Sequence, residues 1–131
     1  MANKKILLVD DEKDFLELMN LRLTQAGYDI IKAYNGQEAV DAVLSKGPDI
    51  VILDYMMPDM DGVTTLREIR TLNKKVPVIM FTAYPETQAM KDTEKLGISA
   101  FIPKLSTYAD TFSLLKSAID LIEKNLHKKG N

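Results

Sequence analysis

Residues 6–12 read ILLVDDE, a run of four aliphatic side chains followed directly by three acidic ones. Four consecutive apolar residues are typical of a short strand that is buried on both faces, as the strands of parallel sheets are. The acidic triplet marks the point where the strand ends. This stretch therefore predicts a buried parallel strand with two carboxylates, Asp10 and Asp11, at its carboxyl end.

Four further segments resemble this first strand in length and composition. They are short, rich in β-branched residues or leucine, and bounded by polar or turn-forming residues. The segments are residues 29–33, which give the weakest pattern, 50–53, 76–81, which Pro77 interrupts, and 100–102. The sequence thus predicts five strands.

The first three segments between the strands have apolar residues at helical spacing. In the first, the apolar stripe is Phe15, Leu16, Met19, Leu23 and Ala26, and the helix stops at Gly27. In the second, Asn35 and Glu38 form a capping box, the inward side chains are Ala39, Val40, Val43 and Leu44, and Gly47-Pro48 is the stop. The third begins near Asp61-Gly62, with Val63, Leu66 and Ile69 facing inward.

Two more helices follow. The fourth is predicted to start at Pro85 and has only Ala89, Met90 and Leu96 as apolar contacts, so it is expected to be the least firmly packed. The last runs over residues 108–126, with Phe112, Leu115, Ile119, Ile122 and Leu126 at helical spacing. Basic residues at its C-terminal end complement the helix dipole.

Strands that alternate five times with helices predict an α/β fold, with a parallel sheet that carries helices on both faces. The length of 131 residues fits one domain over residues 1–131, with residues 127–131 as a basic tail or linker stub. No apolar run is long enough for a membrane span or signal peptide, and the basic C-terminal residues lack interleaved aromatics. We therefore expect a soluble cytoplasmic protein that binds neither membranes nor nucleic acid.

Polar residues follow the apolar runs at the edge where open α/β sheets bind ligands. They are Asp10, Asp11, Asp54, Thr82 and Lys104. Each alone has an ordinary structural explanation, such as a helix cap or a solvated loop charge. Together, three carboxylates would repel one another unless a cation lies among them.

The chemistry of a metal at this edge is limited by composition. The chain has no cysteine and one histidine, His127, near its end, so a metal must be held mainly by oxygen atoms. Oxygen ligands in this number suit Mg²⁺, which takes one or two carboxylates together with phosphate oxygens. A site with a metal ion, a lysine and a hydroxyl group close together is suited to binding a phosphate group.

Four motifs in this order make the sequence similar to the receiver domains of two-component response regulators. The motifs are ILLVDDE at 6–12, DIVILDYMMPDMDG at 49–62, VIMFTAY at 78–84 and FIPK at 101–104. The resemblance covers residues 5–126. It implies a flavodoxin-like (βα)5 fold with strand order 2-1-3-4-5.

The resemblance also implies a role for each motif residue. Asp54 would accept a phosphoryl group from a phosphohistidine on a sensor kinase or phosphotransfer protein. The metal, Mg²⁺ with Mn²⁺ as an alternative, would be bound by Asp11 and Asp54 directly, by Asp10 through water, and by the main-chain carbonyl of Met56. Thr82 and Lys104 would hold phosphoryl oxygens, and Phe101 occupies the position of the aromatic switch residue.

One position departs from the family pattern. The family lysine is usually followed by proline after a cis bond, whereas here Leu105 follows Lys104 and Pro103 precedes it. A cis bond without proline costs about 3 kcal/mol, which favours a trans bond with a reshaped loop, but the sequence leaves open whether the Lys104–Leu105 bond is cis or trans.

Two other kinds of α/β protein with a phosphate site fit this sequence less well. A haloacid-dehalogenase-type phosphatase needs a second carboxylate where this chain has Met56, and a flavodoxin would not place acidic residues in its first phosphate-binding loop. A receiver-like interaction module that works without phosphorylation is the alternative from another class. Such modules usually lack the acidic pair or the acceptor aspartate, whereas this chain has Asp10, Asp11 and Asp54.

Two further expectations concern signal output and lifetime. The surface of the fourth helix, fifth strand and fifth helix, with Leu114, Ala118 and Leu121 on a second face of the last helix, is predicted to contact an effector or a second copy. Met56 and Tyr84, both bulky and largely apolar, flank the path of the attacking water in the family. We expect them to prolong the phosphorylated state.

Overall fold

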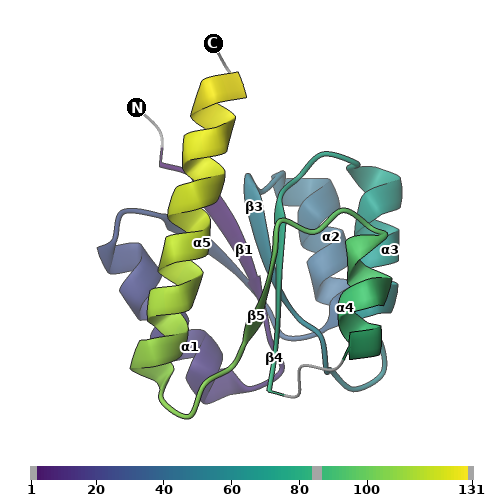
Figure 1. The fold of residues 1–131 in the computed structure, drawn as a ribbon, viewed down its shortest axis with the longest axis horizontal. Helices are drawn as coiled ribbons and strands as arrows, with labels where there is room; N and C mark the ends of the chain where they lie inside the picture. The colour runs from purple at the N-terminus through teal and green to yellow at the C-terminus, as the bar shows by residue number, and fades with distance from the viewer. Residues whose placement is uncertain (1–2, 84–86, 130–131) are drawn as a thin grey trace.

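A computed structural model describes residues 3–83 and 87–129, and the side chains within that range except those of 87–90 and 127–129. Strands and helices alternate along the chain (Figure 1). In order they are β1 (Lys5–Val9), α1 (Lys13–Gln25), β2 (Asp29–Ala33), α2 (Gly36–Lys46), β3 (Ile50–Asp54), α3 (Gly62–Leu72), β4 (Val78–Thr82), α4 (Thr87–Glu94), β5 (Ala100–Pro103) and α5 (Tyr108–Lys129).

The five strands form one parallel sheet in the order β2-β1-β3-β4-β5, which confirms the predicted fold class. β1 and β3 are neighbours in register, with Val9 beside Leu53, so their carboxyl ends finish at the same level. β4 and β5 follow in the same direction, and Thr82 pairs with Pro103. Residues that follow these four strands are therefore brought to one edge.

The sheet separates two hydrophobic cores. Side chains alternate between its faces, so Ile6 and Leu8 of β1 pack into one core while Leu7 and Val9 pack into the other. Helices α1 and α5 cover the first face, and α2, α3 and α4 lie on the second (Figure 1). With both faces covered, β3 and β4 are buried along their whole length.

The predicted starts of two helices are confirmed by their caps. Asn35 Oδ1 accepts a hydrogen bond from Glu38 N at 2.8 Å, and the Glu38 carboxylate accepts one from Tyr34 N. Asp61 Oδ1 accepts a hydrogen bond from Thr64 N at 2.8 Å at the start of α3. These side chains satisfy amide groups that a helix leaves unpaired in its first turn.

Some predicted inward positions were wrong. Leu44 is 72% exposed because Ala39, Ala42 and Val43 form the buried face of α2, and the next residue is turned about 100° away from that face. Ala26 is exposed because α1 ends one residue before it.

Several predicted boundaries also shift. β4 begins after Pro77, which has no amide proton for a ladder hydrogen bond, and α5 continues three residues beyond Leu126. The predicted start of the fourth helix at Pro85 lies outside the described residues, as do the side chains of Ala89 and Met90. In the part of the chain that is described, no helix is long and apolar enough to span a membrane.

Candidate functional site

Asp10 lies at the carboxyl end of β1 and is fully buried. Its backbone N–H donates to Ala33 O at 3.1 Å, which keeps it in line with the sheet, and its Oδ1 accepts a hydrogen bond from Glu12 N at 2.9 Å. Asp11 is the next residue and is exposed. The sequence therefore places one carboxylate inside the sheet edge and one outside it.

Asp54 is the last residue of β3 and is also buried. Its Oδ1 accepts a hydrogen bond from Met56 N at 3.1 Å. Gly62, at the start of α3, donates its N–H to Tyr55 O at 2.8 Å, and a Cβ on Gly62 would lie 2.5 Å from Asp54 O. Only glycine fits this close approach, which ties α3 to the strand that carries Asp54.

Lys104 follows β5 and reaches across the edge to the carboxylates. Its Nζ lies 2.8 Å from Asp10 Oδ2, 3.4 Å from Asp54 Oδ2 and 3.5 Å from Glu12 Oε1. Two aromatic rings, Phe15 at 4.8 Å and Phe81 at 5.1 Å from the ammonium to the ring centres, line its path. The ammonium is thus held among three carboxylates over two π faces.

Burial sets the electrostatics of the site. It raises the pKa of Asp54 to about 7, and the charge of Asp10 adds to this rise. Burial also raises the pKa of Asp10, with Lys104 partly opposing the change. For Lys104 burial favours the neutral amine, but the contacts with Asp10, Asp54 and Glu12 outweigh it and raise its pKa. One ammonium does not fully compensate the buried carboxylates.

The acidic residues form a cluster that could hold a metal ion. Carboxylate oxygens of Asp10, Asp11 and Asp54 lie within 4.8 Å of one another. Asp10 Oδ2 is buried, and the Lys104 ammonium lies 2.8 Å from it as an ion-pair partner. Three carboxylates whose charge a single ammonium does not fully balance, with no soft ligand among them, fit a hard divalent cation.

Thr82 and Phe101 lie on neighbouring strands. Thr82 is buried at the end of β4, and its carbonyl accepts the N–H of Lys104 at 2.7 Å. Phe101 pairs with Met80 in the ladder, is half-buried and packs against the second core. It borders a hollow of about 260 Å³ with Glu94 and Ile98. Thr82 therefore lies at the same edge as Asp54 and Lys104, and Phe101 lies on β5 beside α4.

The two residues predicted to affect the lifetime are only partly described. The Met56 side chain is 55% exposed beside Asp54, while its N–H bonds that carboxylate. Tyr84 lies outside the described residues.

The sequence analysis missed the groups that surround Lys104. Tyr108 donates its hydroxyl to Glu12 Oε2 at 2.8 Å, and its ring meets that of Phe15 edge to face. Glu12 is the third acid of ILLVDDE, so its place beside Asp10 was a usable signal. Phe15 and Phe81 appear in the sequence as ordinary core residues, and nothing in their spacing marks them as neighbours of a cation.

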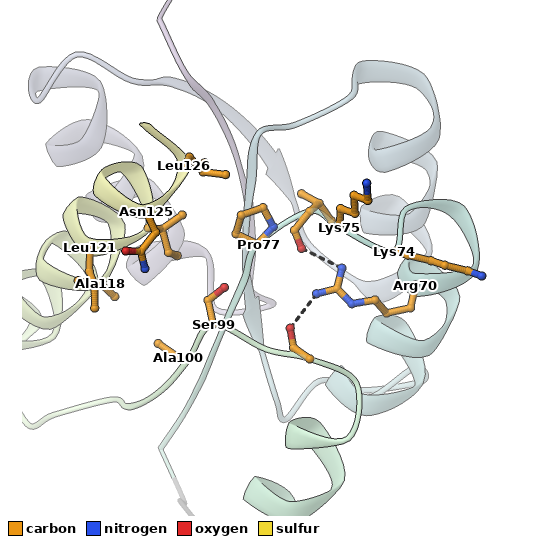
Figure 2. A pocket seen from close by; sticks show the side chains of 13 residues that line it. Arg70, Lys74, Lys75, Pro77, Ser99, Ala100, Ala118, Leu121, Asn125 and Leu126 are labelled. Carbon is orange, nitrogen blue, oxygen red and sulfur yellow. Dashed lines mark hydrogen bonds between the residues drawn. The ribbon is translucent and has the colours of Figure 1, made fainter. Parts of the chain in front are cut away.

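A separate pocket of about 340 Å³ lies where β4 and β5 begin, at the opposite edge of the sheet (Figure 2). Arg70 forms one wall and donates to the carbonyls of Leu96, Asn73, Val76 and Gly97. The opposite wall is α5, with Ala118 and Leu121. The pocket is remote from the carboxylates, and Arg70 serves there to join α3 to the residues before β4 and β5.

Comparisons with known proteins agree with this geometry. The model of the response regulator receiver domain matches residues 6–116. Sporulation initiation phosphotransferase F of Bacillus subtilis is 34% identical over 131 residues, the full length of both chains.

Solved structures show the same fold. A CheY-like receiver domain protein from Methanospirillum hungatei has a TM-score of 0.83 at 26% identity, over 95% of this chain and 99% of that one. The response regulator TrrA from Thermotoga maritima, solved in complex with Mg²⁺ and BeF, has a TM-score of 0.74 at 33% identity, over 88% and 98% of the two chains. The protein belongs to the family of response regulator receiver domains, the signalling domains of two-component systems.

Proposed function

We propose that this receiver domain takes a phosphoryl group from a phosphohistidine of a sensor kinase or phosphotransfer protein onto Asp54. The observation that carries the proposal is the position of the Lys104 ammonium, 3.4 Å from Asp54 Oδ2 and 2.8 Å from Asp10 Oδ2. A cation at this point stabilises the negative charge that builds up on a phosphoryl group during transfer. The full-length similarity to a sporulation phosphotransferase supports a partner of this class.

In the proposed reaction an Asp54 carboxylate oxygen attacks phosphorus, the bond from phosphorus to the donor nitrogen breaks, and an aspartyl phosphate forms. The hydrogen bond from Met56 N to Oδ1 orients the carboxylate, which leaves Oδ2 on the side of Lys104. Lys104 and the Thr82 hydroxyl would then hold phosphoryl oxygens. The chain promotes its own phosphorylation in this way without being an enzyme for another substrate.

We propose Mg²⁺, with Mn²⁺ as an alternative, as the metal of the acidic cluster. Asp10, Asp11, Asp54 and the main-chain carbonyl of Met56 would hold it, and it would neutralise charge on the phosphoryl oxygens when bound. The carboxylate oxygens of Asp10, Asp11 and Asp54, which lie within 4.8 Å of one another, support this assignment. The related TrrA was solved with Mg²⁺ and BeF, which supports the choice of metal.

We further propose that phosphorylation is relayed through Thr82 and Phe101 to the surface formed by α4, β5 and α5. Thr82 would move toward the phosphoryl oxygens, and the hollow beside Phe101 would let that ring turn. Leu114 and Leu121 of α5 are 38% and 61% exposed on this side. An effector or a second copy would bind there. Residues 1–131 would act as one domain, with 127–131 as its tail.

Phosphorylation should need only a small donor. Incubation with acetyl phosphate and Mg²⁺ should add one phosphoryl mass to the protein, because the attacking carboxylate and the stabilising cation are both in this chain. Intact-mass measurement should find no addition to Asp54→Asn, while the control Asp41→Asn, at an exposed position of α2, is labelled like the wild type. An unlabelled wild type would favour the interaction module that works without phosphorylation, and a labelled Asp54→Asn would place the acceptor elsewhere.

Removing one charge should stabilise the metal-free protein. In EDTA, Asp54→Asn is expected to raise the free energy of unfolding by about 1–3 kcal/mol, because Asp10 and Asp54 are buried like charges with one ammonium between them. Urea denaturation measures this, with Asp41→Asn as the neutral control. Mg²⁺ should raise the melting temperature of the wild type more than that of Asp54→Asn. Equal Mg²⁺ effects on both proteins would contradict the metal assignment.

The relay predicts a change far from Asp54. Beryllium fluoride with Mg²⁺, used as a phosphoryl analogue, should alter amide exchange over residues 91–103 and 108–121. Thr82→Ala should reduce that difference, because the hydroxyl group that is proposed to move is absent. Exchange rates that stay the same in both segments of the wild type would contradict the proposed surface.

The lifetime of the aspartyl phosphate should depend on Met56 and Tyr84. Replacing them in the double variant Met56→Asn/Tyr84→Glu should speed dephosphorylation by about tenfold, a barrier change of roughly 1.4 kcal/mol, because polar groups can orient the attacking water. Decay of the labelled protein is followed by intact mass after removal of the donor. An unchanged decay rate with intact Mg²⁺ affinity would show that these side chains do not control water access.

A further inference from the structure

The residue after Lys104 is anchored by its own backbone N–H. Leu105 N donates a hydrogen bond of 2.8 Å to Thr111 Oγ1, in the first turn of α5. Thr111 is fully buried, and its hydroxyl also donates to Thr107 O at 3.1 Å. A hydroxyl group has one proton and two lone pairs, so it can make both bonds at once. The loop after β5 is thereby joined to α5.

This anchor is specific to the sequence at position 105. The peptide bonds of the described residues are all trans, including the one between Lys104 and Leu105, which the sequence left open. A proline at this position, which the family pattern contains, would have no N–H to donate. Leu105 and Thr111 together therefore supply a contact that the family pattern does not allow.

Lys104 is consequently held on both sides of its Cα atom. Its own N–H donates to Thr82 O at 2.7 Å, and the next N–H is bound by Thr111. The lysine side chain is a flexible stem with a point charge, so the carboxylates attract the ammonium but do not fix the backbone from which the stem extends. The position of the ammonium relative to Asp54 depends on where the backbone starts the stem.

We infer that Thr111 is a positioning residue for Lys104. It fixes the backbone after β5 so that the ammonium reaches Asp10 and Asp54. The inference rests on the proposed role of Lys104 in phosphoryl transfer. Thr111 itself touches no carboxylate of the site in the described contacts and acts only through the Leu105 amide.

The chain offers a matched control in Thr65 of α3. Thr65 is also fully buried, and its hydroxyl donates to Asp61 O four residues earlier at 2.8 Å, as the Thr111 hydroxyl does to Thr107 O. In the described contacts no backbone N–H donates to Thr65 Oγ1. Replacing either threonine with valine therefore removes the same helix bond, but only Thr111→Val removes the loop anchor.

The experiment compares Thr111→Val, Thr111→Ser and Thr65→Val with the wild type. In Thr111→Val the Leu105 amide should exchange with deuterium about tenfold faster or more, because its acceptor is gone. The initial rate of phosphorylation by acetyl phosphate and Mg²⁺ should fall about fivefold or more, as expected when a stabilising cation is misplaced. Thr111→Ser, which keeps the hydroxyl group, and Thr65→Val should both stay within about twofold of the wild-type rate.

A second measurement follows the chemical environment of the Lys104 ammonium and does not require phosphorylation. The NMR signal of Lys104 Cε in the metal-free protein should shift or broaden in Thr111→Val and stay in place in Thr65→Val. If the wild type is not phosphorylated, the proposed function fails, while this signal and the Leu105 exchange still decide the positioning role. The inference is overturned if Leu105 exchange is unchanged in Thr111→Val, if Lys104 Cε does not respond, or if Thr111→Ser behaves like Thr111→Val.

Discussion

The ion pairs of one ammonium group with two buried carboxylates are the interaction on which the site depends. Asp10 and Asp54 are both withdrawn from water at the ends of central strands, and each would be costly there as an isolated charge. Lys104 Nζ lies within 3.4 Å of both and partly compensates them. The remaining excess of negative charge makes the edge suited to a second cation. The same excess of charge that destabilises the site is therefore what a divalent cation could neutralise.

The topology of the sheet is what brings these groups together. Asp10, Asp54 and Lys104 belong to or follow strands β1, β3 and β5, and two helical crossovers separate each of these strands from the next along the chain. Parallel strands in register end at one edge, so distant sequence positions converge without any loop having to fold over the site. The helices cover both faces of the sheet and thereby bury β3 and β4 fully.

Much of this could be predicted from the sequence because strand ends are marked locally. An apolar run followed by Asp, Thr or Lys identifies both the strand and the edge, as at Val9-Asp10 and Leu53-Asp54. Side-chain direction within a helix was less predictable, since Val43 and Leu44 are equally apolar and only the contact with α3 and the sheet decides which is buried. The aromatic rings around Lys104 come together through tertiary contacts between α1, β4 and α5, which no local sequence pattern encodes.

Charge attraction and backbone hydrogen bonds act on different parts of Lys104, the ammonium group and the main chain. Attraction to three carboxylates explains why an ammonium resides at this edge, but it acts on the end of a flexible stem and does not fix the backbone at position 104. Hydrogen bonds are short and directional, and those made by Lys104 N with Thr82 and by Leu105 N with Thr111 act on the backbone at the root of that stem. In a chain that lacks proline at position 105, another contact has to fix the backbone of the loop. The buried hydroxyl of Thr111 provides it from the neighbouring helix, so that the change at one position of the loop is matched by a residue one helical turn into α5.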